Sequence, residues 1–454
     1  MIKNLFCFII GLFKSGEGRT QKLKRNVAWS TIIKFGQILI ELAKVPILLT
    51  YLDTEKYGVW LTIVSILMWT HNFDLGLGSG LRYKLTESIA QDNDSRGRGL
   101  VSTAYFSMGL IMLLVFIVVA PILSSLNWNS ILNVHTIENS ELIITIVSIF
   151  LVFAVQFVLE LISVVLKADQ RAAISDVFKP VGSAISLLVI ISLKFFSSNS
   201  LLYASLAMSV PFAVVLFIAN MYYLSKDYSR FRPSFKFFDK KLLKDIYSLG
   251  VKYFLGQFAA LVVFSSSNIL LSNIINPEEV TTYNIARTYF GLVVIFYTII
   301  LVPFAAATTD AYVRKDIDWI KRSMKKLNLV ALLASITIFI MLLASKFAIH
   351  LWVGDKVIVP YSLAIALTIY NMMSVFVSPY ANFQGAVGKL NVRVYIAIFK
   401  IVTFIPAAIF LIKLWGAVGL VVAIIVINTL VNLIFGVIQY KKIINRTAKG
   451  IWDK

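Results

Sequence analysis

Long apolar runs separated by short polar segments repeat along the whole chain. A membrane-spanning helix needs about 20 predominantly apolar residues, and twelve runs of suitable length can be distinguished. They fall at 26–50, 57–75, 101–123, 141–166, 180–196, 200–224, 247–275, 281–306, 327–347, 360–384, 394–413 and 417–440. The pattern predicts an all-α integral membrane protein with about 12 transmembrane helices.

The composition supports the same class of protein. Of the 454 residues, 59% are hydrophobic and only 15% are charged, which is more apolar surface than a soluble domain can bury. The formal net charge of +20 could suggest a nucleic-acid partner. However, the basic residues lie in short segments between the apolar runs, as they do in polytopic membrane proteins. We therefore expect no nucleic-acid partner.

The distribution of positive charge predicts the orientation of the chain. With the N-terminus in the cytoplasm, 33 of the 43 lysines and arginines fall in inner segments and five in outer segments. The remaining five lie within the apolar runs: Lys34, Lys44, Lys252, Arg287 and Lys400. Because cytoplasmic loops carry the excess of Lys and Arg, we expect both termini on the cytoplasmic side of a bacterial cytoplasmic membrane.

A basic segment in the middle of the chain divides the twelve runs into two sets of six. We expect a cytoplasmic or interfacial segment at 1–25, an N-terminal lobe at 26–224, a basic linker at 225–246, a C-terminal lobe at 247–440 and a basic tail at 441–454. A short similarity connects the first run of each half, which reads KFGQ at 34–37 and FLGQ at 254–257. This favours a parallel internal repeat with a pseudo-two-fold axis, as in some transporters.

Residues for covalent or metal-dependent chemistry do not form a recognisable pattern. The single cysteine, Cys7, cannot form an intrachain disulfide, and the three histidines lack ligand spacing. The sequence shows no nucleophile–base constellation and no ATP-binding loop. We therefore predict no catalytic residues, no metal and no cofactor.

Four polar residues share one face of the first apolar run: Lys34, Gln37, Glu41 and Lys44. At about 100° per residue, they fall within about 80° of one another. A charged side chain at the bilayer centre costs at least about 2.5–3.5 kcal/mol, so this face must meet a partner or water. Glu41 can pair with Lys44 three residues later, whereas Lys34 has no local acid. We hypothesise that the stripe lines a water-filled cavity.

Other apolar runs carry weaker polar faces that could line the same cavity. The candidate substrate-binding residues on these faces are Gln257, Asn268, Asn284, Arg287, Asn371 and Asn382. The alternative for the amides is hydrogen bonding between packed helices, at roughly 0.6 kcal/mol each.

A glycine-rich segment, FDLGLGSGLR, begins at Phe73, where the second run meets the cytoplasm. We assign it to a cytoplasmic mouth of the cavity, with the candidate residues Asp74, Gly76, Gly78, Gly80 and Arg82. Its backbone could form an anion-binding nest, or it could be a helix break leading into an amphipathic surface helix. It is not a nucleotide-binding loop.

Two stretches carry a resemblance to a known family. RNVAWSTIIKFGQILIELAKVPILLTYLDTEKYGVWLTIVSIL and FDLGLGSGLR resemble the opening of bacterial polysaccharide flippases, which translocate O-antigen and exopolysaccharide repeat units. This family belongs to the multidrug/oligosaccharidyl-lipid/polysaccharide exporter superfamily, and the similarity is clearest over 24–105.

The resemblance implies two six-helix lobes in a V that open to each side of the membrane in turn. The implied substrate is an undecaprenyl-pyrophosphate-linked oligosaccharide, whose head group would cross through a cationic cavity. Implied partners are this lipid-linked oligosaccharide, membrane lipids, polysaccharide polymerase and chain-length proteins, and a coupling ion.

Two other functions fit an apolar chain of this kind. A multidrug exporter of the same superfamily would need buried acids for cationic drugs, but only Glu41, Glu160 and Asp74 qualify, against five bases within the runs. A membrane-embedded polysaccharide polymerase or ligase would need a large outer loop with catalytic groups. The longest outer segment, at 124–140, carries no Lys or Arg. An anionic substrate therefore fits the charges better.

Overall fold

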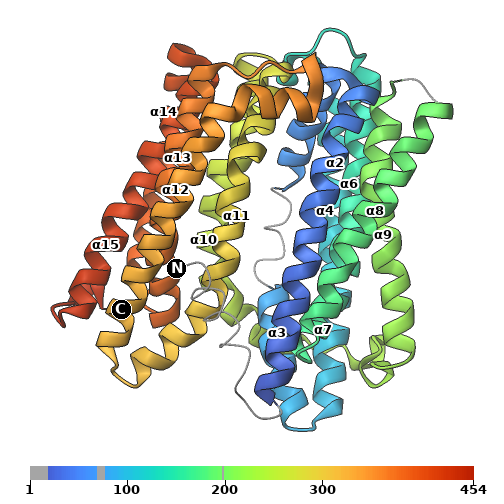
Figure 1. Cartoon of the computed structure of the whole chain (residues 1–454). Helices are drawn as coiled ribbons and strands as arrows, with labels where there is room; N and C mark the ends of the chain where they lie inside the picture. Colours follow the sequence, from blue (N-terminus) through green and yellow to red (C-terminus); the bar gives the residue numbers. More distant parts are fainter. Residues whose placement is uncertain (1–18, 69–76, 197–198, 454) are drawn as a thin grey trace. The chain divides into compact units, whose positions relative to one another are not determined.

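The computed structural model describes residues 19–68, 77–196 and 199–453, which are helical throughout apart from turns and short connections. Figure 1 shows the helices running side by side within the chain's two parts. The α-helices are α2 (Arg19–Leu67), α3 (Leu77–Ala90), α4 (Asp94–Ser125), α5 (Trp128–Leu132), α6 (Asn139–Leu159), α7 (Leu161–Ala168), α8 (Ala172–Phe196), α9 (Leu201–Ser225), α10 (Lys240–Ile274), α11 (Pro277–Val313), α12 (Ile317–Val353), α13 (Tyr361–Val387), α14 (Asn391–Ala423) and α15 (Val431–Ile444). Short 3₁₀ turns lie at Ser229–Phe231, Phe235–Phe237, Gly354–Lys356 and Gly450–Trp452, and a π-helix at Ile424–Leu430.

The helices cover the apolar runs of the sequence. Among the described residues, eight helical stretches are long and apolar enough to cross a membrane. One of them, Asn391–Ile444, contains two of the predicted runs. Helix α2 likewise contains the first run and, as far as Leu67, the second. The prediction of an all-α membrane protein is confirmed.

The two long helical stretches that contain two apolar runs each, α2 and Asn391–Ile444, are interrupted between those runs. Within α2, Asp53 has a φ of 68°, and its carboxylate accepts a hydrogen bond from the backbone N–H of Lys56 at 3.0 Å. This is the geometry of an N-cap, so Asp53 begins a new helical segment. Within α14, Gly416 has a φ of 59°, a value that glycine adopts without strain. The second run of each pair therefore begins after a break in the helix.

The chain forms two compact units. Unit 1 comprises residues 1–51, 73–126 and 143–251, and unit 2 comprises 52–72, 127–142 and 252–454. The part of α2 that follows Asp53 thus belongs with the C-terminal helices. The lobe boundaries expected from the sequence, 26–224 and 247–440, stay a prediction.

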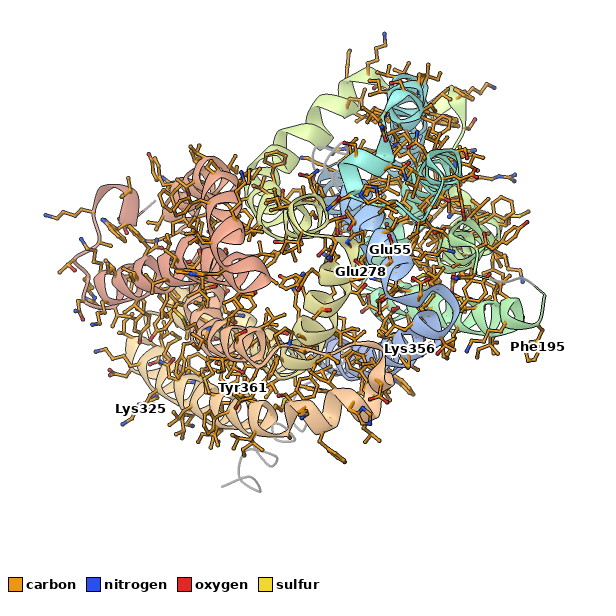
Figure 2. The ribbon with its side chains drawn as sticks, turned by 90° about the horizontal axis from the view of Figure 1, so that it is seen from above. Glu55, Phe195, Glu278, Lys325, Lys356 and Tyr361 are labelled. Atoms are coloured by element: carbon orange, nitrogen blue, oxygen red, sulfur yellow. The ribbon has the colours of Figure 1, made fainter. Side chains whose placement is uncertain are left out.

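Packing at one end of unit 2 shows why segment 52–72 joins it. The hydroxyl of Thr281 donates a hydrogen bond to the carbonyl of Thr54 at 2.7 Å. A Cβ on Gly58 would meet the Pro277 carbonyl, so the two backbones lie in close contact there. Figure 2 labels Glu55 and Glu278 in this region. A side chain at position 58 would therefore separate the two segments.

The core of each unit is built from helices with an apolar stripe. In unit 1, Leu77, Leu81 and Leu85 recur every four residues on α3 and are fully buried. This spacing gives a helix one apolar face, which packs against α4 and α7. In unit 2, α13 packs against α11, α12, α14 and α15 and so occupies the centre of the core.

Segment 226–243, which follows α9, folds back over unit 1. The phenol of Tyr228 donates a hydrogen bond to the Asp169 carboxylate at 2.8 Å, and Arg171 binds Asp227 at 2.7 Å. Burial raises the pKa of the Tyr228 phenol above its ordinary value, and the hydrogen bond to Asp169 raises it further. The phenol therefore stays protonated and keeps its role as donor.

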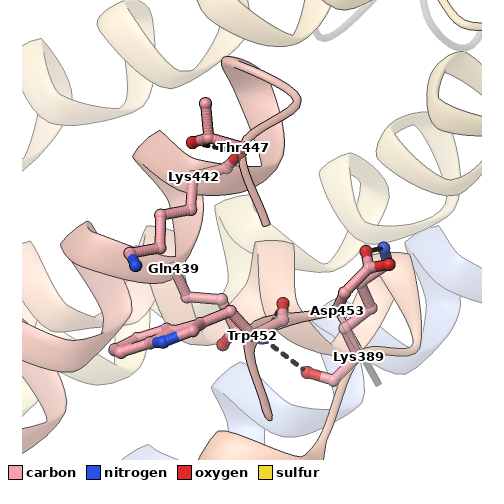
Figure 3. A network of polar contacts seen from close by, with 6 residues as sticks. All are labelled: Lys389, Gln439, Lys442, Thr447, Trp452 and Asp453. Atoms are coloured by element: carbon pink, nitrogen blue, oxygen red, sulfur yellow. Dashed lines mark hydrogen bonds and ion pairs between the residues drawn. The ribbon is translucent and has the colours of Figure 1, made fainter. Parts of the chain in front are cut away.

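A second segment folds back in unit 2, where residues 450–453 meet the connection between α13 and α14 (Figure 3). Lys389 forms an ion pair with Asp453. The buried Gln439 amide donates hydrogen bonds to the carbonyls of Lys389 and Trp452, at 3.2 and 3.3 Å. The Trp452 ring stacks on Phe435, and the Lys442 ammonium lies 4.8 Å from its centroid. The chain end is thereby fastened to the ends of three helices.

We predict that Gly419→Ala destabilises the protein by about 1–3 kcal/mol, the usual cost of overpacking. A Cβ at Gly419 would meet the backbone carbonyl of Leu411, which cannot move aside as a flexible side chain would. Thermal unfolding in detergent measures the effect. Gly291→Ala is the matched control, because a Cβ there meets no atom within 4 Å. Equal midpoints for the two variants would contradict the prediction.

Candidate functional site

The polar stripe of α2 lies in unit 1, and part of it is internally paired. The Lys44 ammonium is 3.3 Å from the Glu41 carboxylate, as the i, i+3 spacing predicts. The hydroxyl of Ser183, on α8, donates a second hydrogen bond to Glu41 at 2.6 Å. Lys44 is buried whereas Glu41 is about half exposed. The pair therefore neutralises a lysine that has little access to water.

Lys34 differs from Lys44 in its surroundings. Its side chain is exposed, and it makes no hydrogen bond or ion pair within the described part of the chain. Gln37, one turn later, is half-buried. Lys34 is thus a cation on the exposed side of the stripe that remains available to a ligand.

Helix α8 adds two residues that the sequence analysis missed. Lys179 acts electrostatically on Lys44, and Ser183 follows it by one helical turn. The i, i+4 spacing of Lys179 and Ser183 was a readable signal, but the sequence analysis placed Lys179 in a cytoplasmic segment. The structure places it inside α8. Helix α8 therefore adds a second lysine close to the Lys44–Glu41 pair.

A second polar cluster lies in unit 2. The amide of Asn284 on α11 donates a hydrogen bond to Asn268 on α10 at 2.8 Å. Asn268 in turn donates to the hydroxyl of Ser65, in the part of α2 that follows Asp53, at 2.9 Å. Arg287 lies one turn after Asn284, with its guanidinium 5.0 Å from the Phe264 ring centroid. The structure thus brings together three predicted residues and adds Ser65.

Two other predicted amides of unit 2 donate to backbone carbonyls. Asn371 is buried and donates to the carbonyl of Leu367 in its own helix at 2.7 Å. Asn382 of α13 donates to the carbonyl of Leu301 in α11 at 3.3 Å. The contact of Asn382 favours the alternative of bonding between packed helices, whereas the bond of Asn371 stays within its own helix. Gln257 belongs to the part of α10 whose side chains lie outside the described residues.

The predicted cytoplasmic mouth is described only from Leu77 onward. Gly78 and Gly80 lie within α3 and have helical backbones, without the positive φ that a nest requires. Arg82 is exposed on the same helix. The structure therefore favours the surface-helix alternative here, while Asp74 and Gly76 lie outside the described residues.

Helix α14 contributes a buried cation that the sequence analysis did not select. Lys400 is 9% exposed and has no hydrogen bond or ion pair among the described residues. Arg393 lies seven residues earlier and therefore on the same helix face. Lys400 was visible as an intramembrane base, but α14 has no polar stripe around it to mark a site.

Carboxylate, histidine and cysteine side chains do not cluster as metal ligands. Over residues 19–68, 77–196 and 199–453, no group of three or more such side chains could hold a metal ion. What the described residues offer a ligand is cationic charge and amide hydrogen bonding.

We predict that Glu41→Gln destabilises the protein more than Lys44→Gln does. Loss of Glu41 leaves the ammonium of the buried Lys44 without its counterion, whereas loss of Lys44 leaves the half-exposed Glu41 with Ser183 and water. Unfolding midpoints of both single variants and the double variant give a coupling free energy, which we expect at about 0.5–3 kcal/mol for residues in contact. Additive effects in this cycle would show that the pair is not coupled.

The chain is similar in sequence to known proteins of bacterial O-antigen export. It is 22% identical over 375 residues to a putative O-antigen export protein of Yersinia pseudotuberculosis, covering 80% of this chain and 83% of that one. It is 22% identical over 314 residues to a putative O-antigen transporter of Salmonella typhimurium, covering 67% and 69%.

Solved structures of transporters share the fold. The inward-facing conformation of a multidrug resistance MATE family transporter of the MOP superfamily matches with a TM-score of 0.74 at 15% identity, over 91% of this chain and 96% of that one. The outward-facing conformation of a MATE family transporter matches with a TM-score of 0.64 at 15% identity, over 94% and 96%. At this identity the likeness shows the fold alone.

A family model extends the sequence similarity over most of the first two thirds of the chain. The model for the family described as "Polysaccharide biosynthesis protein" matches residues 23–308, which is more than half of the chain. This range includes the stretches that carry the resemblance noted in the sequence, as well as the α2 stripe and the Asn268–Asn284 cluster. The chain therefore belongs to the polysaccharide biosynthesis protein family.

Proposed function

We propose that the protein is a flippase for an undecaprenyl-pyrophosphate-linked oligosaccharide. It would move the repeat unit of a surface polysaccharide across the bacterial cytoplasmic membrane, with both termini in the cytoplasm. Membership of the polysaccharide biosynthesis family and the names of the two O-antigen relatives support this function. They also support transport rather than catalysis.

The observation that carries the proposal is the excess of cationic charge on α2 and α8. Glu41 is already engaged by Lys44 and Ser183, so it does not neutralise the exposed Lys34. Taking a pyrophosphate from water into a low-dielectric region is very unfavourable unless charges or hydrogen bonds compensate. Lys34 and Lys179 supply such charges beside a helix that lies within the membrane. This arrangement favours an anionic substrate.

The amide cluster of unit 2 is suited to the sugar part of the substrate. The Asn284 side-chain carbonyl accepts no hydrogen bond from the described residues, so it can accept one from a sugar hydroxyl. Arg287 lies beside it and can bind a phosphate or an acidic sugar. In the proposed cycle, the lobes at 26–224 and 247–440 open to each side of the membrane in turn, and the lipid tail stays in the bilayer.

A multidrug exporter is the second candidate, because the MATE transporters share the fold. Fold alone does not decide the substrate. A cationic drug would need a carboxylate free to bind it, but Glu41 is shared between Lys44 and Ser183. If the protein were a drug exporter, its loss would make cells more sensitive to cationic drugs and leave surface polysaccharide intact.

We predict that Lys34→Gln lowers transport about tenfold or more while the protein stays folded. A hydrogen bond to a charged group contributes about 1.5–3 kcal/mol, and about 1.4 kcal/mol corresponds to a tenfold change in rate. Complementation of surface-polysaccharide synthesis in a strain lacking the protein measures the loss. Lys325→Gln is the control, because Lys325 is exposed near the start of α12 and points away from the helices (Figure 2).

The charge itself is tested by Lys34→Arg, which should keep much of the activity, and by the double variant Lys34→Ala/Arg287→Ala. We expect this double variant to abolish complementation, because it removes cations from both units. Full complementation by it would refute the cationic route. The polar stripe would then be a helix-packing feature.

A further inference from the structure

A groove of about 880 Å³ runs along α4 in unit 1. One wall is α4 between Tyr105 and Leu113, and the other is formed by Pro233, Phe235 and Phe238, from the segment that follows α9. Val158 of α6 contributes to the lining, and Lys240 lies at the start of α10. The lining contains no residue of the α2 stripe, so the groove is separate from the proposed route of the sugar.

Hydrogen bonds and packing hold the second wall in place against α4. The backbone N–H of Ser234 donates to the Ser102 hydroxyl at 3.1 Å, and that of Asp239 donates to Thr103 at 3.0 Å. The buried Phe231 packs against Gly97, where a Cβ would require the ring to shift. The groove is therefore a built feature of unit 1.

The interior of the groove is apolar. Phe106 and Phe235 stack with their centroids 3.7 Å apart, and Leu110 and Leu113 on α4 are more than half exposed. Because a helix rises about 1.5 Å per residue, the α4 wall is about 12 Å long, and it lies within the predicted span 101–123. An apolar groove at this depth is filled by a hydrocarbon chain rather than by water.

The end of the groove at the membrane surface is positively charged. Lys240 belongs to the lining, and Arg232, Lys236 and Lys241 are exposed on the same segment. Lys236 and Lys240 form no ion pair within the described residues. Asp239 is the one acid between Arg232 and Lys241. This excess of cations is complementary to a lipid head group with a negative charge.

We propose that the groove binds an anionic phospholipid of the bilayer, with an acyl chain along Leu110 and Leu113, beside the stacked rings of Phe106 and Phe235, and its phosphate at Lys236 and Lys240. The site is independent of the flippase function. The bound lipid fills the space between α4 and the segment 226–243, and it strengthens the attachment of that segment to unit 1.

Phosphatidylglycerol and phosphatidylcholine, added to the full-length protein in detergent, test the proposal through the thermal unfolding midpoint. Phosphatidylglycerol should raise the midpoint and phosphatidylcholine should not. In Lys236→Gln/Lys240→Gln, the phosphatidylglycerol concentration that gives half of the shift should increase about tenfold or more, as expected when two cations that attract the head group are lost. Lys321→Gln/Lys325→Gln in unit 2 is the matched control and should leave it unchanged.

The acyl-chain site is tested by Gly109→Leu. Gly109 belongs to the lining, and a Cβ there meets no atom within 4 Å, so the leucine side chain is expected to extend into the groove. Native mass spectrometry should show bound phosphatidylglycerol on the unchanged protein and on the control Gly291→Leu, and little on Gly109→Leu. The proposal would be overturned if both phospholipids raised the unfolding midpoint equally, or if the control variants lost as much phosphatidylglycerol binding as the groove variants. It would also be overturned if polyprenyl phosphate displaced phosphatidylglycerol at a far lower concentration.

Discussion

The structure depends on one constraint: a polar group inside a bilayer must find its partner within the protein, because the hydrocarbon supplies none. Helices satisfy the backbone, and side chains are satisfied by bonds between helices. Gln156 of α6 donates to the carbonyl of Ser209 in α9 at 2.7 Å, and Gln384 of α13 donates to Gln439 of α15 at 2.8 Å. These bonds fix which helices are neighbours and in what register, which apolar packing alone does not specify.

The same constraint applies to the cations that have no partner among the described residues. Lys44 satisfies this constraint because it pairs with Glu41, which also accepts a hydrogen bond from Ser183. Lys34 and Lys400 do not follow it among the described residues, although one is exposed and the other buried. Charged groups retained within membrane segments are expensive and mark functional sites. In a protein of the polysaccharide biosynthesis family, the two lysines are therefore the first places to look for contact with an anion.

The sequence predicted the helices well because hydropathy and the length of a span are local properties. It also predicted the Glu41–Lys44 pair, since the two residues are one turn apart on a single helix. The contacts of Ser183 with Glu41 and of Ser65 with Asn268 could not be predicted, because each joins residues that are far apart in sequence. The burial of Lys400 depends on how α14 packs, which its own pattern does not reveal. The positions of Gly78 and Gly80 within α3 were also undecided, because glycine is compatible with both a helix and a nest.

The two segments that fold back are built alike. A residue with positive φ, Gln170 in one case and Gly388 in the other, is followed by a basic residue, Arg171 or Lys389, which binds an aspartate of the returning segment. Ribosomes make the chain from the N-terminus, so each basic residue emerges well before the aspartate that it binds. Each ion pair can therefore form only after the helix that precedes its aspartate, α9 or α15, has been synthesised.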